Sequence, residues 1–124
     1  MSKIIINHEI KSSSLKEMIK EKKAILKDGL ITYNNDGINV GVKINNDSVF
    51  LTRENKDMKI SLEFELNKSL VTKYIIKDIK TEIILKTVTK KLIIEKNKLL
   101  IEYDLYMNNE FSDSFEYSLE WRCL

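Results

Sequence analysis

Strict alternation of apolar and polar side chains is the feature that most constrains how this 124-residue chain folds. Over residues 58–66 every second residue is apolar, and the residues between them are Lys, Ser or Glu. Residues 99–107 and 115–121 repeat the pattern. Successive side chains of a strand point to opposite faces, so this period of two indicates antiparallel strands with one face on a core and the other in water.

Short polar breaks between these segments predict tight turns, because Asn, Asp and Gly tolerate the positive φ angles of hairpins. The chain contains no proline that would interrupt a strand. The predicted strands are residues 3–10, a segment ending near residue 26, and residues 30–33, 38–44, 49–53, 58–66, 70–76, 82–95, 99–107 and 111–121. We therefore predict a single domain over residues 1–124, a mostly β antiparallel barrel of about eight to ten strands, whose closure removes exposed edges.

Residues 14–22 fit two structures. Ser14-Leu15-Lys16-Glu17 matches a helix capping box, and the apolar residues that follow fall near helical spacing. The alternative is a strand that leads into a hairpin turn at Asp28-Gly29. The residues alone leave one short helix and a strand equally open for 14–22, whereas a hairpin is favoured over residues 24–33.

Composition argues against several classes of partner. The chain has 21 basic and 19 acidic residues, and only two of the basic ones are arginine, the residue favoured for base and phosphate recognition. A single cysteine excludes an internal disulfide. No apolar run approaches the roughly 20 residues that span a bilayer, and the N-terminal isoleucines are too few for a signal peptide. We expect a cytoplasmic protein with no nucleic-acid or membrane partner.

No residue set with recognisable chemistry stands out. His8 is the only histidine, and as an acid–base group it would need a partner and a cleft, so we expect it to be packed in the barrel or at its end. One histidine and Cys123 cannot form the usual zinc tetrahedron. Three glycines provide no phosphate loop, and Gly41 is expected to mark a bulge or bend. We expect no catalytic residue, metal site or cofactor, and no enzymatic activity.

An ordered series of short patterns from residue 27 onward resembles a known family. The patterns are Val49-x-Leu51-x-Arg53, a strand reaching Phe64, Tyr74, Ile83-x-Leu85-x-Thr87 with Lys90-x-Leu92, and Ile101-x-Tyr103-x-Leu105 before Asn109-Glu110. Their order is similar to that of the YwiB-like domain-of-unknown-function family of Firmicutes. The resemblance implies a calycin-like, lipocalin-shaped barrel, favours strand for much of residues 14–26, and supplies no catalytic residues. Asn55 stands where the family often has glycine, which affects turn geometry more than the fold.

Six residues are candidates for ligand binding or for closing the barrel end. Arg53 follows an apolar strand, and in calycin barrels an arginine often packs over a tryptophan, here Trp121. Its other readings are a cavity residue that pairs with a carboxylate or phosphate, and a solvated loop residue. Inward tyrosine and threonine hydroxyls need partners, which indicates either a polar-lined cavity or a satisfied core. The candidates are Arg53, Tyr33, Tyr74, Thr87, Tyr103 and Trp121.

Two functional hypotheses follow. The first is a barrel of otherwise unknown function that holds a small amphipathic ligand in its interior. The alternative is a protein-interaction or homo-oligomeric module without a small-molecule ligand. It would dock another chain on an unpaired strand edge, such as residues 3–10 or the segment after them.

Overall fold

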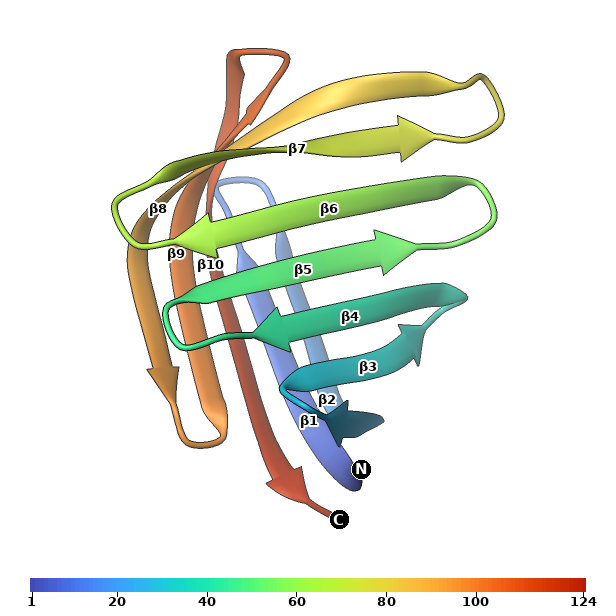
Figure 1. Ribbon diagram of the computed structural model, residues 1–124, viewed down its shortest axis with the longest axis vertical. Helices are drawn as coiled ribbons and strands as arrows, with labels where there is room; N and C mark the ends of the chain where they lie inside the picture. The colour runs from blue at the N-terminus through green and yellow to red at the C-terminus, as the bar shows by residue number, and fades with distance from the viewer.

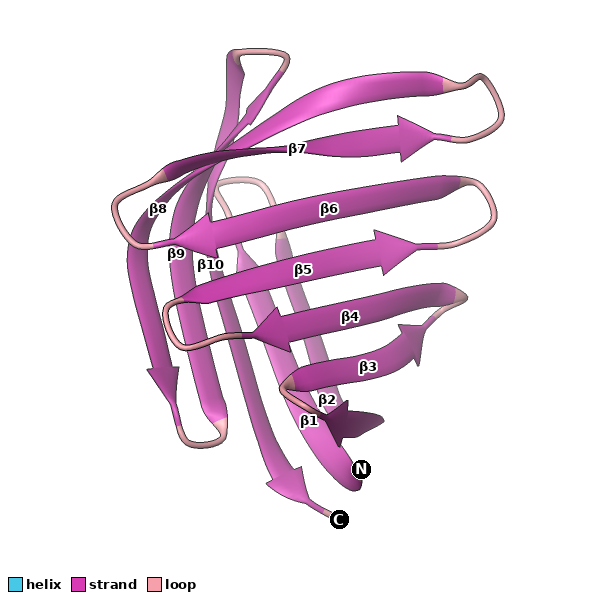
Figure 2. Ribbon diagram, in the orientation of Figure 1, coloured by secondary structure: helices cyan, strands magenta, loops and turns pink.

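The chain folds into ten antiparallel strands and no helix (Figures 1 and 2). The computed structural model describes residues 1–124. The strands are β1 (Ser2–Lys11), β2 (Lys16–Lys27), β3 (Leu30–Asn35), β4 (Ile38–Ile44), β5 (Ser48–Glu54), β6 (Met58–Glu65), β7 (Ser69–Ile76), β8 (Thr81–Glu95), β9 (Lys98–Met107) and β10 (Glu110–Cys123). Each strand pairs with the next, and β1 pairs with β10 to close the barrel. The predicted antiparallel β-barrel is confirmed.

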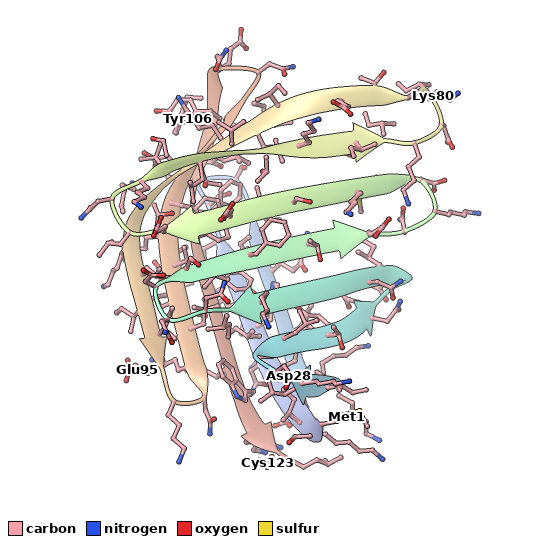
Figure 3. The ribbon with its side chains drawn as sticks, in the orientation of Figure 1. Met1, Asp28, Lys80, Glu95, Tyr106 and Cys123 are labelled. Carbon is pink, nitrogen blue, oxygen red and sulfur yellow. The ribbon has the colours of Figure 1, made fainter.

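The barrel wall consists of two layers whose strands cross. Strands β3 to β7 run across the view of Figure 1, whereas β9, β10, β1 and β2 run steeply behind them. The long strand β8 bends from one layer into the other, so that Lys80 and Glu95, at its two ends, lie far apart (Figure 3). Register shifts add one residue each to β2, β8 and β10, which lets these long strands turn.

The polar breaks form the tight turns that were predicted from their Asn, Asp and Gly content. Asp28 and Gly29 have φ angles of 51° and 78°, and Asp36 and Gly37 have angles of 51° and 85°. Asn108 and Asn109, at 50° and 68°, repeat this geometry between β9 and β10. Two consecutive positive φ angles give a turn whose twist matches that of the flanking strands.

Of the contested residues 14–22, residues 16–22 belong to strand β2 and residues 14 and 15 precede it, so the helix reading is wrong. A bulge explains the helix-like spacing: Glu21 has a φ of 54°, and its amide donates to the Oδ1 atom of Asn7 at 3.0 Å. Before the bulge Ile19 faces the interior, and after it Ala24 does. Without the added residue, the inward-facing residues would stay an even number of positions apart. With it, Ile19 and Ala24 are five positions apart, and this irregular spacing resembles a helical period.

Gly41 does not mark a bulge, because β4 pairs with β3 and β5 without a register shift. A Cβ atom at this position would lie 2.9 Å from the Oγ1 atom of Thr52 and 3.7 Å from the Cδ1 atom of Leu30. Gly41 therefore lets its neighbours approach the wall closely, which is a second use of glycine in strands.

The hydrophobic core fills the interior with residues from every strand except β7. Residues at most 1% exposed include Ile4, Ile6, Leu99, Ile101 and Leu119, which come from the three adjacent strands β1, β9 and β10. The structure has no helix with the length and apolar character needed to cross a membrane. Ile31, Val42, Val49 and Phe64, from β3 to β6, are equally buried, so the core is continuous around the barrel.

Candidate functional site

The barrel encloses a cavity of about 280 Å³. Twenty residues line it, and sixteen of them are aliphatic or aromatic. The other four are His8, Glu17, Asn35 and Arg53. A largely apolar hollow with a few converging polar groups is the usual form of a small-molecule site, and this volume is close to the lower limit for such sites.

The cavity borders the most weakly paired part of the wall. Strand β2 pairs with β3 only through Ile25, Leu26 and Lys27, so residues 16–24 have no strand on that side. Figure 1 shows β1 and β2 running away from β3 beyond this short ladder. Ile19 in this segment and Leu15 just before it line the cavity, and Leu15 is 44% exposed. The cavity therefore meets solvent along the free edge of β2.

Arg53 is the only Lys or Arg side chain that lines the cavity. Arg53 is the second-last residue of β5 and is half-buried. It pairs with Val40 of β4 and with Ile60 of β6. Its guanidinium takes part in none of the ion pairs or side-chain hydrogen bonds of the structure. Five N–H donors are thus available to a bound molecule.

A cluster of His8, Tyr33 and Tyr117 forms one polar wall of the cavity. The Nδ1 atom of His8 lies 3.2 Å from the hydroxyl oxygen of Tyr33, and the rings of His8 and Tyr117 meet edge to face at 5.1 Å. Burial lowers the pKa of His8, with Glu17 opposing and Arg53 adding to the shift. A neutral His8 accepts the Tyr33 proton at Nδ1, which leaves the proton of the imidazole on Nε2.

Two buried polar atoms of this cluster lack a well-formed hydrogen bond. The Nε2 atom of His8 has no partner, and the hydroxyl of Tyr117, whose residue is 3% exposed, interacts only weakly with the hydroxyl of Tyr33. Buried polar atoms without such a bond are uncommon, and each one needs a physical explanation. Both belong to side chains that line the cavity, so a bound molecule is the natural partner.

Tyr33, Tyr103 and Tyr117 in the cavity have raised pKa values and remain protonated at neutral pH. Burial raises the pKa of Tyr33 to about 12, against an opposing effect of Arg53. Burial also raises the pKa of Tyr103 and Tyr117, again opposed by Arg53. The three hydroxyls are therefore hydrogen-bond donors as well as acceptors.

The structure brings four of the six candidate residues together. Arg53, Tyr33, Tyr74 and Tyr103 line the same cavity, although they come from β5, β3, β7 and β9. Thr87 faces the core but not the cavity, and its hydroxyl donates to the carbonyl oxygen of Glu63. Thr87 is therefore a satisfied core residue.

The predicted stacking of Arg53 on Trp121 is wrong. Trp121 pairs with Ile6 and does not line the cavity, whereas Tyr117, four residues earlier on β10, does. The cation that lies over an aromatic ring in this structure is Lys86, whose Nζ atom is 4.5 Å from the Tyr106 ring centre. Alternation identified which side chains of β10 point inward, but not how far along the barrel each one lies.

The residues missed at the sequence level are Glu17, Asn35 and Tyr117. Tyr117 belongs to the alternating apolar face of residues 115–121, so its inward direction was readable from the sequence. Glu17 was hidden by the bulge in β2, which left its direction undefined by alternation. His8 lies in the barrel interior as expected, although its link to Tyr33 depends on barrel closure.

Strand edges and metal ligands were also considered as sites. Strand β1 pairs with both β2 and β10, so the predicted free edge at residues 3–10 is wrong. The free edge lies on β2, over residues 16–24, which belongs to the other segment that the sequence had suggested as an edge. No three His, Cys, Asp or Glu side chains gather in a geometry that could hold a metal ion, and Cys123 is exposed near the end of β10 (Figure 3).

The fold and the cavity define a closed ten-stranded antiparallel β-barrel with a hollow, mainly apolar interior. The chain belongs to the family described as Domain of unknown function (DUF1934), whose profile matches residues 5–119. Its fold is similar to the crystal structure of the ywiB protein from Bacillus subtilis, with a TM-score of 0.62 and 17% identity over 98% of this chain and 90% of that one. No curated protein gives a significant match. The resemblance to the YwiB-like family is confirmed.

Proposed function

We propose that the protein is a binding module that holds a small amphipathic ligand inside the barrel. The observation that carries this proposal is the 280 Å³ cavity, in which an apolar lining surrounds one unpaired guanidinium and two buried polar atoms that lack a well-formed hydrogen bond. The apolar lining would take up the hydrophobic part of the ligand, because removing apolar surface from water is favourable. The polar groups would orient its other end.

The cavity volume limits the size of this ligand. At about 30 Å³ for each water-sized group, 280 Å³ holds roughly nine or ten non-hydrogen atoms. Small ligands gain between about 0.3 and 1.5 kcal/mol per non-hydrogen atom. A molecule of this size would therefore bind with a dissociation constant in the millimolar range or tighter.

The alternative, a protein-interaction or homo-oligomeric module, would use the free edge of β2. The exposed side chains of that segment include Lys16, Lys20 and Lys23. Lysine on an edge strand discourages pairing with another chain, so this edge favours the ligand-binding proposal. A cytoplasmic location and the absence of enzymatic activity stay predictions.

Filling the cavity tests the proposal. We expect 1-hexanol, titrated into ¹⁵N-labelled protein, to shift the backbone amide signals of cavity residues in the wild type. The Leu105→Trp variant places an indole in the cavity and should lose these shifts, because Leu105 lines it. Val71→Trp adds the same bulk on a side chain that is 64% exposed, and should bind like the wild type.

The proposal fails if wild-type protein shows no saturable shifts at cavity residues. It also fails if Leu105→Trp, shown to be folded by its dispersed amide spectrum, binds 1-hexanol as the wild type does.

A further inference from the structure

The interior of the barrel carries one positive charge that reaches polar groups of several strands. Burial raises the pKa of Tyr33 on β3, Tyr103 on β9 and Tyr117 on β10, and the charge of Arg53 on β5 partly offsets each rise. His8 of β1 is influenced both by Glu17, which also lines the cavity, and by Arg53. A charge in a cavity with low-dielectric walls produces a strong local field, so the space beside Arg53 favours an anionic group.

No acidic side chain of the chain neutralises Arg53. Glu17 is the only Asp or Glu that lines the cavity, and it forms no ion pair with Arg53. The other arginine shows the usual arrangement, since the guanidinium of Arg122 lies 2.6 Å from the Oε2 atom of Glu21 on the exterior. A charged group removed from water without a partner is costly, and a bound anion would remove that cost.

The buried polar atoms of His8 and Tyr117 supply further donors. The Tyr117 hydroxyl is buried with its proton on, and the Nε2 atom of a neutral His8 that accepts from Tyr33 carries the second proton. A carboxylate offers about four acceptor positions on two oxygens, and guanidinium binds it in a planar, two-point geometry. A phosphate would add a second negative charge, for which the cavity has no second cation.

We infer that the ligand of this cavity is a small monocarboxylate, whose carboxylate binds the guanidinium of Arg53 and whose apolar body of roughly five to seven carbon atoms fills the space between β5, β9 and β10. The inference rests on the proposed function, because it assigns the polar end of the amphipathic ligand. Arg53 is the residue that distinguishes an acid from a neutral molecule of the same shape. Tyr117 and His8 position the second carboxylate oxygen.

A matched pair of ligands separates this inference from the proposed function. Hexanoate and 1-hexanol have the same chain and differ in the charged group. We expect the wild type to bind hexanoate at least tenfold more tightly than 1-hexanol. The Arg53→Gln variant should bind hexanoate roughly ten- to a hundredfold more weakly, as is usual for the loss of hydrogen bonds to a charged group, and should lose far less affinity for 1-hexanol, which carries no charge.

Arg122→Gln is the matched control, because it removes the same charge outside the cavity and should leave both affinities unchanged. Retained 1-hexanol binding shows that Arg53→Gln is folded. If that variant does not fold, Arg53→Lys keeps the charge but lacks the planar fork, and should still lower the preference for hexanoate.

Each other outcome overturns one of the two proposals. Equal binding of hexanoate and 1-hexanol by the wild type refutes the carboxylate and leaves the binding module in place. No binding of either ligand refutes the binding module itself. Tighter binding of norleucine than of hexanoate, lost in Glu17→Gln, would show that the cavity selects a zwitterion, and would also refute the monocarboxylate.

Discussion

The two sides of the barrel differ in how completely their strands are joined. Strands β8, β9, β10 and β1 form long ladders, with ten residue pairs between β8 and β9 and eight between β1 and β10. By contrast, three pairs join β2 to β3, and three join β6 to β7. Side chains from all ten strands line the cavity, but its border with solvent lies at the short ladder of β2. The continuity of the ladders therefore decides where the interior is accessible.

Leu119→Ala should produce the largest loss of stability. Leu119 is 0% exposed, lies on the well-joined side and does not line the cavity, so its truncation should cost about 2–5 kcal/mol. Leu105→Ala removes the same atoms beside an existing hollow, and should cost less, because less packing is lost there. The free energy of unfolding in urea measures both, and equal losses would show that Leu105 is packed as completely as Leu119, which would contradict a hollow beside Leu105.

Thr87→Val should have a smaller effect, at the corner where β8 passes β6. The Thr87 hydroxyl donates to the carbonyl oxygen of Glu63 across a stretch where β6 lacks ladder pairs to β7. Losing this bond should cost roughly 0.5–1.5 kcal/mol, and more if the carbonyl is left without a donor.

Thr89→Val is the matched control for that bond. Thr89 is equally buried, but its hydroxyl has no partner, so replacing it by a methyl group should be neutral or stabilising. Equal destabilisation of the two variants in urea unfolding would show that the Thr87 bond contributes nothing to closing the corner.

His8 should make the smallest contribution, and one that depends on pH. Its pKa in the folded state is below the ordinary value of 6.5, so the unfolded chain binds more protons between the two values. Stability therefore falls as the pH drops from 6.5 through the folded-state pKa of His8. His8→Gln should flatten this part of the stability profile, measured by urea unfolding between pH 7.5 and 5.0. An identical pH dependence in both proteins would show that His8 is not buried in its neutral form.

Much of the fold was readable from the sequence, because alternation reports directly on which face of a strand is buried. The segment predicted as residues 58–66 is β6 at Met58–Glu65, and the segment predicted as 99–107 is β9 at Lys98–Met107. Alternation fails where a residue is inserted, and the bulge at Glu21 in β2 accordingly produced the helix alternative. Side-chain direction is local information, and it survives only while the register is regular.

The site was predictable in part, for a related reason. Arg53 and the three cavity tyrosines were identified because each lies in phase with an apolar face or follows one. The position of these side chains along the barrel axis depends on how the ten strands are staggered when the sheet closes. The same stagger decides that Trp121 does not reach the cavity. Gly41 shows the same limit, because its role is set by Thr52 on the neighbouring strand.

The short ladder between β2 and β3 determines where a molecule can enter the interior of the barrel. A molecule can enter along residues 16–24 of β2, where no ladder pair to β3 has to break, while the β1–β10 ladder stays intact. Local movements of this edge cost far less than global unfolding. Uptake and release would then be fast and independent of overall stability, so that a stabilising change in the dense core would leave the residence time of a guest unaltered.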